Sequence, residues 1–470
     1  MIRLVNWYEE VLARKEELLK DLKELLKIES VKDESSTSTR FPMGEKVGEA
    51  LDLMLSKAGS SGFHTKNVDG YAGYAEHGDG SHDDMIGILC HVDVVPATGE
   101  WTTPPFEPTI RDGKLFARGA IDDKGPTMAA YYGLKIVKEL GLPLQKRVRL
   151  IFGTDEESGM SCMKHYQEVE TMPSVGFAPD ADFPIINAEK GQINTRLVIG
   201  PATEEYLGEV RLVSFKAGER SNMVPEQATV ILQGSVDHLL LEFEGFCTKQ
   251  GVRRKITHLD DSVEITLYGL SAHGMEPHIG VNAGTTLASF LRDFDFTGTA
   301  AQFLDFLDEL HLDFEGKTLN ISYKDDITGP LTVNPGVLHF EEEKGGTVQL
   351  NVRCPVTTKF EETKEVLTAQ VKEKGFEVED IKVSPPHHVG SDHPMIQALQ
   401  EAYQQETGLE PTLLSTGGAT YARFMENGVA FGACFPGKEM TAHQKDEYIE
   451  VEDLLKATAI YARAIYNLAR

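Results

Sequence analysis

One segment restricts the fold of this chain more than any other. Residues 85–95, MIGILCHVDVV, form a nearly continuous apolar run rich in β-branched side chains, which predicts a strand covered on both faces. Residues 127–140 then show helical spacing, and Gly141, which follows them, is a helix stop signal. Residues 148–152 (VRLIF) predict a second buried strand. Strand, helix and strand in this order predict an α/β domain, a mostly parallel sheet with flanking helices.

The sequence pattern changes twice along the chain. Between residues 189 and 384 the strands alternate apolar and polar residues, which is typical of a sheet with one wetter face. After residue 384 two prolines follow, and the α/β pattern resumes. Because 470 residues are too many for one comfortable core, we predict one α/β domain split into residues 1–188 and 385–470. An α+β domain of residues 189–384 is inserted into it.

Charge and composition exclude several kinds of partner. The chain has 46 Lys and Arg against 74 Asp and Glu, a formal net charge of −28. This charge repels nucleic acid and anionic membrane surfaces, so we expect neither as a partner. No stretch approaches the roughly 18 apolar residues of a membrane span, and the charged helical pattern of residues 2–29 is not that of a signal peptide. Five scattered cysteines without CxxC spacing fit free thiols in a reducing cytoplasm.

Candidate metal ligands lie where the predicted strands end, which is where open α/β sheets bind their ligands. They are His91 and Asp93 in HVD, Asp122 in RGAIDDKG, Glu156 and Glu157 in GTDEESG, Asp180 in PDADFP and His443 in TAHQKDEY. Imidazoles and carboxylates without a thiolate suit zinc, manganese or cobalt. Taken alone, each motif is also compatible with an ordinary structural role, as a turn, a helix cap or surface charge. Their coincidence at strand ends and tight turns favours a metal site.

These motifs resemble those of the aminoacylase and carboxypeptidase G type metallopeptidases, and within that superfamily the chain is most similar to the PepV-type dipeptidases. The resemblance covers essentially the whole length, including the inserted domain and the late motifs STGGATYAR and AHQKDEY. It implies hydrolysis of a small peptide, a dipeptide, with two divalent ions per chain. Zn²⁺ is the expected ion, with Mn²⁺ and Co²⁺ as alternatives. The resemblance also implies a cis peptide between Asp122 and Asp123.

The resemblance further implies that the α/β domain is the catalytic domain, and it implies a role for each candidate residue there. The ligands divide into one bridge and two pairs: Asp122 between the metals, His91 with Asp180, and Glu157 with His443. Glu156 is expected to be the general base that activates a metal-bridging water. Asp93 is expected to orient the imidazole of His91, because a metal-bound histidine needs a partner on its other ring nitrogen.

The inserted domain is expected to act as a lid and to complete the site. The resemblance implies that His273, in LSAHGMEP, stabilises the oxyanion, an effect of about 2.7–4 kcal/mol. Asn222 in RSNMVP and Arg353 in NVRCP look like residues that bind the substrate's C-terminal carboxylate. Gly418 is a candidate for close approach of the substrate. If the motifs are set aside, the ordinary interpretation is that His273 is an exposed histidine of a loop and that Arg353 is a solvated arginine.

Two rival functions use the same residues. An N-acyl amino acid deacylase or desuccinylase shares the dinuclear core, and a non-catalytic metal- or peptide-binding protein keeps the ligands. Glu156 favours catalysis, because binding alone needs no free base beside the metals. Since a large inserted domain can supply His273 within one chain, we expect a monomer.

Overall fold

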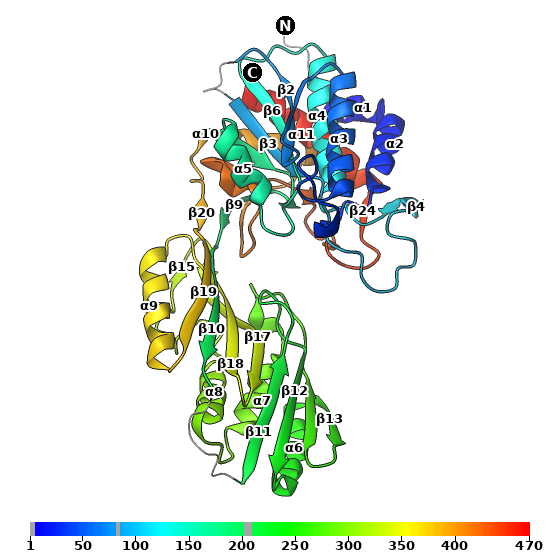
Figure 1. Cartoon of the computed structure of the whole chain (residues 1–470). Coiled ribbons are helices and arrows are strands. Elements are labelled where there is room, and N and C mark those ends of the chain that lie inside the picture. The colour runs from blue at the N-terminus through cyan, green and yellow to red at the C-terminus, as the bar shows by residue number, and fades with distance from the viewer. Residues whose placement is uncertain (1–4, 81–84, 202–208) are drawn as a thin grey trace. The chain divides into compact units, whose positions relative to one another are not determined.

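The computed structural model describes residues 5–80, 85–201 and 209–470 (Figure 1). The chain forms two compact units. The first unit consists of residues 1–188, 388–415 and 419–470, and the second of residues 189–387 and 416–418. The second unit is therefore an insertion in the sequence of the first.

The first unit is built on a mixed sheet. Among the described residues it has nine strands in the order β1-β2-β6-β3-β7-β22-β9-β20, with β21 paired to β9. They are β1 His64–Val68, β2 Ala72–His77, β3 Met85–His91, β6 Arg147–Gly153, β7 Val175–Ala178, β9 Ile185–Glu189, β20 His387–His388, β21 Leu413–Thr416 and β22 Asn427–Ala430. Strands β6, β3, β7 and β22 are parallel, whereas β1, β2 and β9 have antiparallel neighbours.

This sheet confirms the α/β prediction and corrects one part of it, since the sheet is mixed rather than mostly parallel. The connection between β1 and β2 explains part of the difference. Only three residues separate the end of β1 at Val68 from the start of β2 at Ala72, and so short a connection can join only antiparallel strands. The parallel strands lie in the middle, where β3 is buried along its whole length.

Helices cover this sheet. They are α1 Trp7–Leu12, α2 Lys15–Leu26, α3 Glu45–Ser60, α4 Lys124–Glu139, α5 Ser161–Val169, α10 Pro394–Thr407 and α11 Val451–Ala469. The N-terminal helical pattern is found as α1 and α2, while residues 2–4 lie outside the described residues. Helix α4 packs against α2 and α11 (Figure 1). Gly133 permits the contact with α11, because a Cβ there would lie 3.0 Å from the backbone nitrogen of Ala462.

Small sheets at the edge of the first unit connect distant parts of its sequence. The antiparallel sheet β24-β5-β4 consists of β4 Thr109–Arg111, β5 Lys114–Phe116 and β24 Tyr448–Glu450. It pairs Tyr448 with Phe116. A second, parallel pair joins β8 Ala181–Asp182 to β23 Ala433–Cys434. These pairings bring the C-terminal segment of the chain beside the segments that precede α4 and follow β7.

The second unit is an α+β structure. Its main sheet is antiparallel, with the order β13-β14-β12-β11-β17-β18-β10-β19 among the described residues. The strands are β10 Gly191–Ile199, β11 Val210–Ala217, β12 Gln227–Gly234, β13 Arg253–His258, β14 Val263–Tyr268, β17 Thr332–Glu341, β18 Gly345–Cys354 and β19 Glu377–Ser384, and a short pair is β15 Lys324–Asp325 with β16 Gly329–Pro330. The helices are α6 Asp237–Gln250, α7 Ala283–Leu291, α8 Gly298–Glu309 and α9 Phe360–Glu373. Burial alternates along β10 and β12, as expected of a sheet with one wetter face.

Two sequence-based expectations are tested by these elements. All five cysteines are free and buried, as expected of structural thiols. No helix within the described ranges is long and apolar enough to cross a bilayer. The use of the second unit as a lid stays a prediction.

Candidate metal centre

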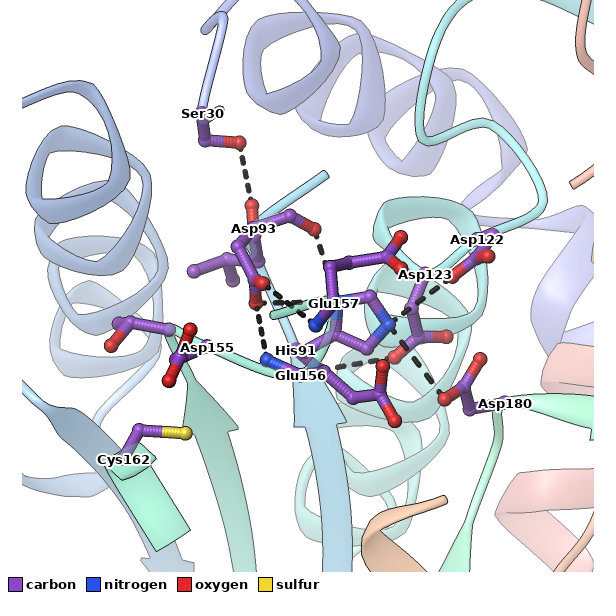
Figure 2. Close-up of polar contacts among 12 residues, drawn as sticks. Ser30, His91, Asp93, Asp122, Asp123, Asp155, Glu156, Glu157, Cys162 and Asp180 are labelled. Atoms are coloured by element: carbon purple, nitrogen blue, oxygen red, sulfur yellow. Dashed lines mark hydrogen bonds and ion pairs between the residues drawn. The ribbon is translucent and has the colours of Figure 1, made fainter. Parts of the chain in front are cut away.

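The candidate ligands of the first unit meet at the ends of its parallel strands (Figure 2). His91 is the last residue of β3 and lies opposite Gly153, the last residue of β6. Glu156 and Glu157 follow β6 in a turn, and Asp180 follows β7. Parallel strands that end together therefore place these side chains at one edge of the sheet. The turn also explains how two consecutive glutamates can serve one site, since on a regular strand they would point to opposite faces.

Asp122 lies between two groups of side chains. Its Oδ1 is 3.2 Å from Nε2 of His91, and that nitrogen is also 3.7 Å from Oδ2 of Asp180. Its Oδ2 is 3.1 Å from Nε2 of His443, which is also 2.9 Å from Oε2 of Glu157. One carboxylate thus faces two histidines, each with a second carboxylate beside it. These distances are compatible with one bridge and two pairs, and the roles of these residues as metal ligands stay a prediction.

The donor set fits divalent cations. Nε2 of His91 is buried and makes no hydrogen bond, although carboxylate oxygens of Asp122 and Asp180 surround it (Figure 2). Ligand atoms of His91, Asp122 and Glu157 all lie within 4.8 Å of one another, as do those of His91, Glu156 and Asp180. Buried carboxylates at such distances repel one another and are desolvated unless a cation neutralises them.

Burial and the close carboxylates shift the pKa values of the side chains at this site. Burial, with the charge of Asp180 added, raises the pKa of Glu156 well above its usual range. Burial and the charge of Asp122 raise the pKa of Glu157 to about 7. Burial disfavours the charged form of His443, but the carboxylates of Asp122 and Glu157 outweigh it and raise the pKa of that imidazole. Without cations the site therefore holds protons, which cations must displace.

Asp93 contacts two parts of the site, and its predicted role in orienting His91 stays a prediction. Nδ1 of His91 lies 3.0 Å from the backbone oxygen of Asp93, and 3.4 Å from its carboxylate. The carbonyl accepts from Nδ1–H and so leaves Nε2 facing the carboxylates. The Asp93 carboxylate also accepts hydrogen bonds from the backbone N–H groups of Glu156 and Glu157, at 3.2 and 3.1 Å. Its side chain thus fixes the turn that presents both glutamates.

Asp123 is a residue of the site that the sequence analysis did not assign. Its Oδ2 accepts from the backbone N–H of His91 and from Oγ1 of Thr127, both at 3.1 Å. The same Thr127 hydroxyl lies 3.0 Å from the backbone oxygen of His91. Asp123 therefore fastens the end of β3 to the start of α4. Its place beside Asp122 in the DDKG motif was the available signal, and the implied cis peptide between these two residues is present.

The remaining candidates lie in the second unit. The N–H of Gly274 donates to the backbone oxygen of Asn222 at 2.7 Å, next to His273. Nδ1 of His273 lies 3.2 Å from the N–H of Met275 and accepts from it. A neutral imidazole that accepts at Nδ1 carries its proton on Nε2, and this tautomer can donate to an oxyanion.

Arg353 is only 4% exposed, so the ordinary alternative of a solvated arginine is wrong. Its Nε donates to Oδ1 of Asn351 at 2.9 Å and its Nη1 to the backbone oxygen of Gly417 at 2.8 Å, beside Gly418. A Cβ on Gly417 would lie 2.6 Å from Cβ of Met275. The segments of Arg353, Gly418 and His273 therefore neighbour one another within the second unit. Their roles toward a substrate stay predictions.

Known proteins resemble the chain over nearly its whole length. The sequence model of "Peptidase family M20/M25/M40" matches residues 87–467. "Putative dipeptidase YtjP" of Bacillus subtilis (strain 168) is 46% identical over 99% of this chain and 100% of its own length. "Putative dipeptidase SH1171" of Staphylococcus haemolyticus (strain JCSC1435) is 40% identical over 98% of this chain and 99% of its own length. The solved structure of the di-peptidase Dug1p from Saccharomyces cerevisiae covers 98% of both chains with a TM-score of 0.59 at 12% identity, which shows a shared fold.

Proposed function

Because the chain belongs to peptidase family M20/M25/M40, we propose that it is a metal-dependent dipeptidase of the PepV type. Membership of the family makes the chain a peptidase. A dipeptide as substrate is supported by relatives that are 46% and 40% identical over nearly the whole chain and whose names call them dipeptidases. The observation that carries the proposal is the Asp122 carboxylate, with one oxygen facing each of two histidines.

We assign one cation to the pair His91 and Asp180 and a second to the pair Glu157 and His443, with Asp122 shared between them. Nitrogen and oxygen donors without a thiolate favour Zn²⁺ and also suit Mn²⁺ or Co²⁺. If bound, two such cations would polarise the scissile carbonyl and lower the pKa of the attacking water.

Glu156 is the proposed general base. It lies within the group of ligand atoms that includes His91 and Asp180, and its backbone is held by the Asp93 carboxylate. In the proposed reaction Glu156 takes a proton from the attacking water and returns it to the leaving amide nitrogen.

The second unit is the proposed source of oxyanion and carboxylate recognition. His273 would donate its Nε2–H to the oxyanion, which is consistent with the hydrogen bond that Nδ1 accepts. Arg353 and Asn222 would bind the C-terminal carboxylate of the dipeptide, and Gly418 would leave room for it. The guanidinium of Arg353 is buried and held by Oδ1 of Asn351 and the backbone oxygen of Gly417, beside Gly418, and a fixed guanidinium next to this glycine supports the role.

The proposal is tested by activity after chelation and separate addition of Zn²⁺, Mn²⁺ and Co²⁺, on a panel of dipeptides, tripeptides and N-acyl amino acids. We expect no activity without metal and recovery of dipeptide hydrolysis on addition. A preference for N-acylated amino acids over dipeptides with a free amine would indicate a deacylase instead. Binding of metal and peptide without turnover of any member would indicate a non-catalytic binding protein.

We also propose that the enzyme acts as a monomer in the cytoplasm. Five free, buried cysteines without a disulfide support a reducing compartment. The monomer follows from a second unit large enough to supply His273 within the same chain. A solution mass near twice the 51.9 kDa of the chain would contradict it.

A further inference from the structure

The loop that carries His443 is held closed by its own residues. The Thr441 hydroxyl donates to the backbone oxygen of Tyr448 at 3.0 Å and accepts from the N–H of Tyr448 at 3.1 Å. Between them, His443 and Asp446 have φ values of 63° and 55°, which reverse the chain sharply. The loop ends at Glu447, directly before β24, and β24 pairs with β5. The end of the loop therefore lies next to β5.

The Glu447 side chain leaves this loop and enters the segment that carries Asp122. It is fully buried. One carboxylate oxygen, Oε1, accepts from the backbone N–H groups of Ile121 at 2.9 Å and Asp122 at 3.2 Å. The other, Oε2, accepts from the N–H of Gly119 at 3.0 Å and from Nη1 of Arg118 at 2.6 Å. One carboxylate therefore fixes the backbone from residue 118 to residue 122.

These hydrogen bonds take the place of secondary structure. Residues 117–123 lie between β5 and α4 and belong to neither a helix nor a strand, yet their N–H groups are buried and need acceptors. The two carboxylate oxygens of Glu447 accept from three of these N–H groups, those of Gly119, Ile121 and Asp122. Its own backbone oxygen accepts from the N–H of Ala117 at 3.1 Å, so backbone and side chain both join the two segments.

We propose that Glu447 is a positioning residue that sets the distance between Asp122 and His443. The carboxylate holds the backbone nitrogen of Asp122, and it lies four residues after His443 in a closed loop. Moving either segment would change the 3.1 Å separation of the two side chains. This inference rests on the proposed function, in which Asp122 and His443 bind the same cation.

A Glu447→Gln substitution tests this role with little change in size. Whichever way its amide turns, an NH₂ group replaces one oxygen and faces backbone N–H donors, and Arg118 loses its counter-charge. Partners that hold metal ligands in place typically change metal affinity by about 10–100-fold when they are altered. We expect a loss of this size for the cation held by Asp122 and His443.

Glu76→Gln is the matched control. Glu76 also pairs with a buried arginine, since its Oε1 accepts from Nε and Nη2 of Arg149 at 3.0 and 2.8 Å. In the sheet, Arg149 of β6 lies opposite Gly87 of β3, and Gly87 precedes His91 by four residues. Four residues of a strand span about 13 Å at about 3.3 Å per residue, so Gly87 is about this far from His91. The control therefore breaks a buried ion pair of the same unit at a distance from the proposed ligands.

The experiment measures Zn²⁺ binding to the metal-free full-length proteins by competition with a chromophoric chelator, with thermal melts of each metal-free protein alongside. The wild type is expected to bind two equivalents. Glu447→Gln is expected to bind one of them about 10–100-fold more weakly, and Glu76→Gln to bind both within about twofold of the wild type even where its melting temperature falls. Activity of Glu447→Gln should return at high Zn²⁺ with KM unchanged.

Two results would overturn the inference alone: wild-type affinity for both equivalents in Glu447→Gln, or an equal loss of affinity in Glu76→Gln. A wild type that binds no Zn²⁺ would overturn the proposed function and this inference with it. If Glu447→Gln does not fold, Glu447→Asp provides the same comparison. It keeps the charge but withdraws the carboxylate by one methylene, so weaker binding of one equivalent is again expected and unchanged affinity would contradict the role.

Discussion

Substitution of Asp93 by asparagine probes the turn that presents the proposed base and a proposed ligand. In the native protein the Asp93 carboxylate accepts from the N–H of Glu156 at 3.2 Å and from the N–H of Glu157 at 3.1 Å. Each oxygen serves one of these donors. An asparagine keeps the shape of the side chain but has one carbonyl oxygen, so one of the two N–H groups must face an NH₂ group instead.

The size of the effect follows from this loss. A hydrogen bond to a charged acceptor contributes about 1.5–3 kcal/mol, which corresponds to about 10–150-fold in a rate or an equilibrium constant. The backbone oxygen of Asp93 is unchanged and keeps its 3.0 Å contact with Nδ1 of His91. We therefore expect kcat to fall by about 10–150-fold through displacement of Glu156 and Glu157. The ion assigned to His91 should stay bound.

The assay is the steady-state hydrolysis of a dipeptide at saturating metal, with metal content measured on the same samples. Glu76→Gln serves as the control for the loss of a buried carboxylate elsewhere in the same unit. An Asp93→Asn enzyme with wild-type kcat would refute the idea that this carboxylate sets the turn. Loss of the ion assigned to His91 would show instead that the side chain acts mainly through that histidine.

Three further properties of the protein can be measured. Burial and Asp122 raise the pKa of Glu157 to about 7 in the metal-free protein, so this group is largely protonated below pH 7 and loses its proton as the pH rises. Zn²⁺ affinity should therefore increase between about pH 6 and 8, with protons released in calorimetric titrations in buffers of different ionisation enthalpy; a pH-independent affinity would contradict this. Glu156→Gln should lower kcat by about 10²–10⁴-fold with both ions retained, while Glu168→Gln, an exposed glutamate of α5, should match the wild type; loss of an ion in Glu156→Gln would make that residue a ligand. Gly133→Leu should lower the free energy of unfolding by about 1–3 kcal/mol, because its Cβ alone would lie 3.0 Å from the backbone of Ala462; an unchanged denaturant midpoint would show that α4 and α11 can separate without cost.

The residues of the centre were predictable to the extent that strand ends predict proximity. His91 ends one buried strand, and Glu157 and Asp180 follow two others. Parallel strands end at one edge of a sheet, so the meeting of these residues follows from the order of elements. The antiparallel β1–β2 pair was not predicted, because its strands lack the continuous apolar pattern that marked β3.

Contacts between segments distant in sequence could not be predicted in the same way. Glu447 reads as one more charged residue in QKDEY, and only the pairing of β24 with β5 brings its carboxylate to Asp122. Asp93 was expected to orient His91 because it lies two residues further along the chain. Its carboxylate also accepts from the N–H groups of Glu156 and Glu157, and no local sequence pattern predicts where a turn will present its N–H groups.

The central claim is that Asp122 is shared by two cations, and an anomalous difference map from a crystal soaked in Zn²⁺ tests it most directly. We expect two peaks about 3.5–4 Å apart, one beside His91 and Asp180 and the other beside Glu157 and His443, with an oxygen of Asp122 facing each. A single peak, or two peaks that do not flank the Asp122 carboxylate, would contradict the account.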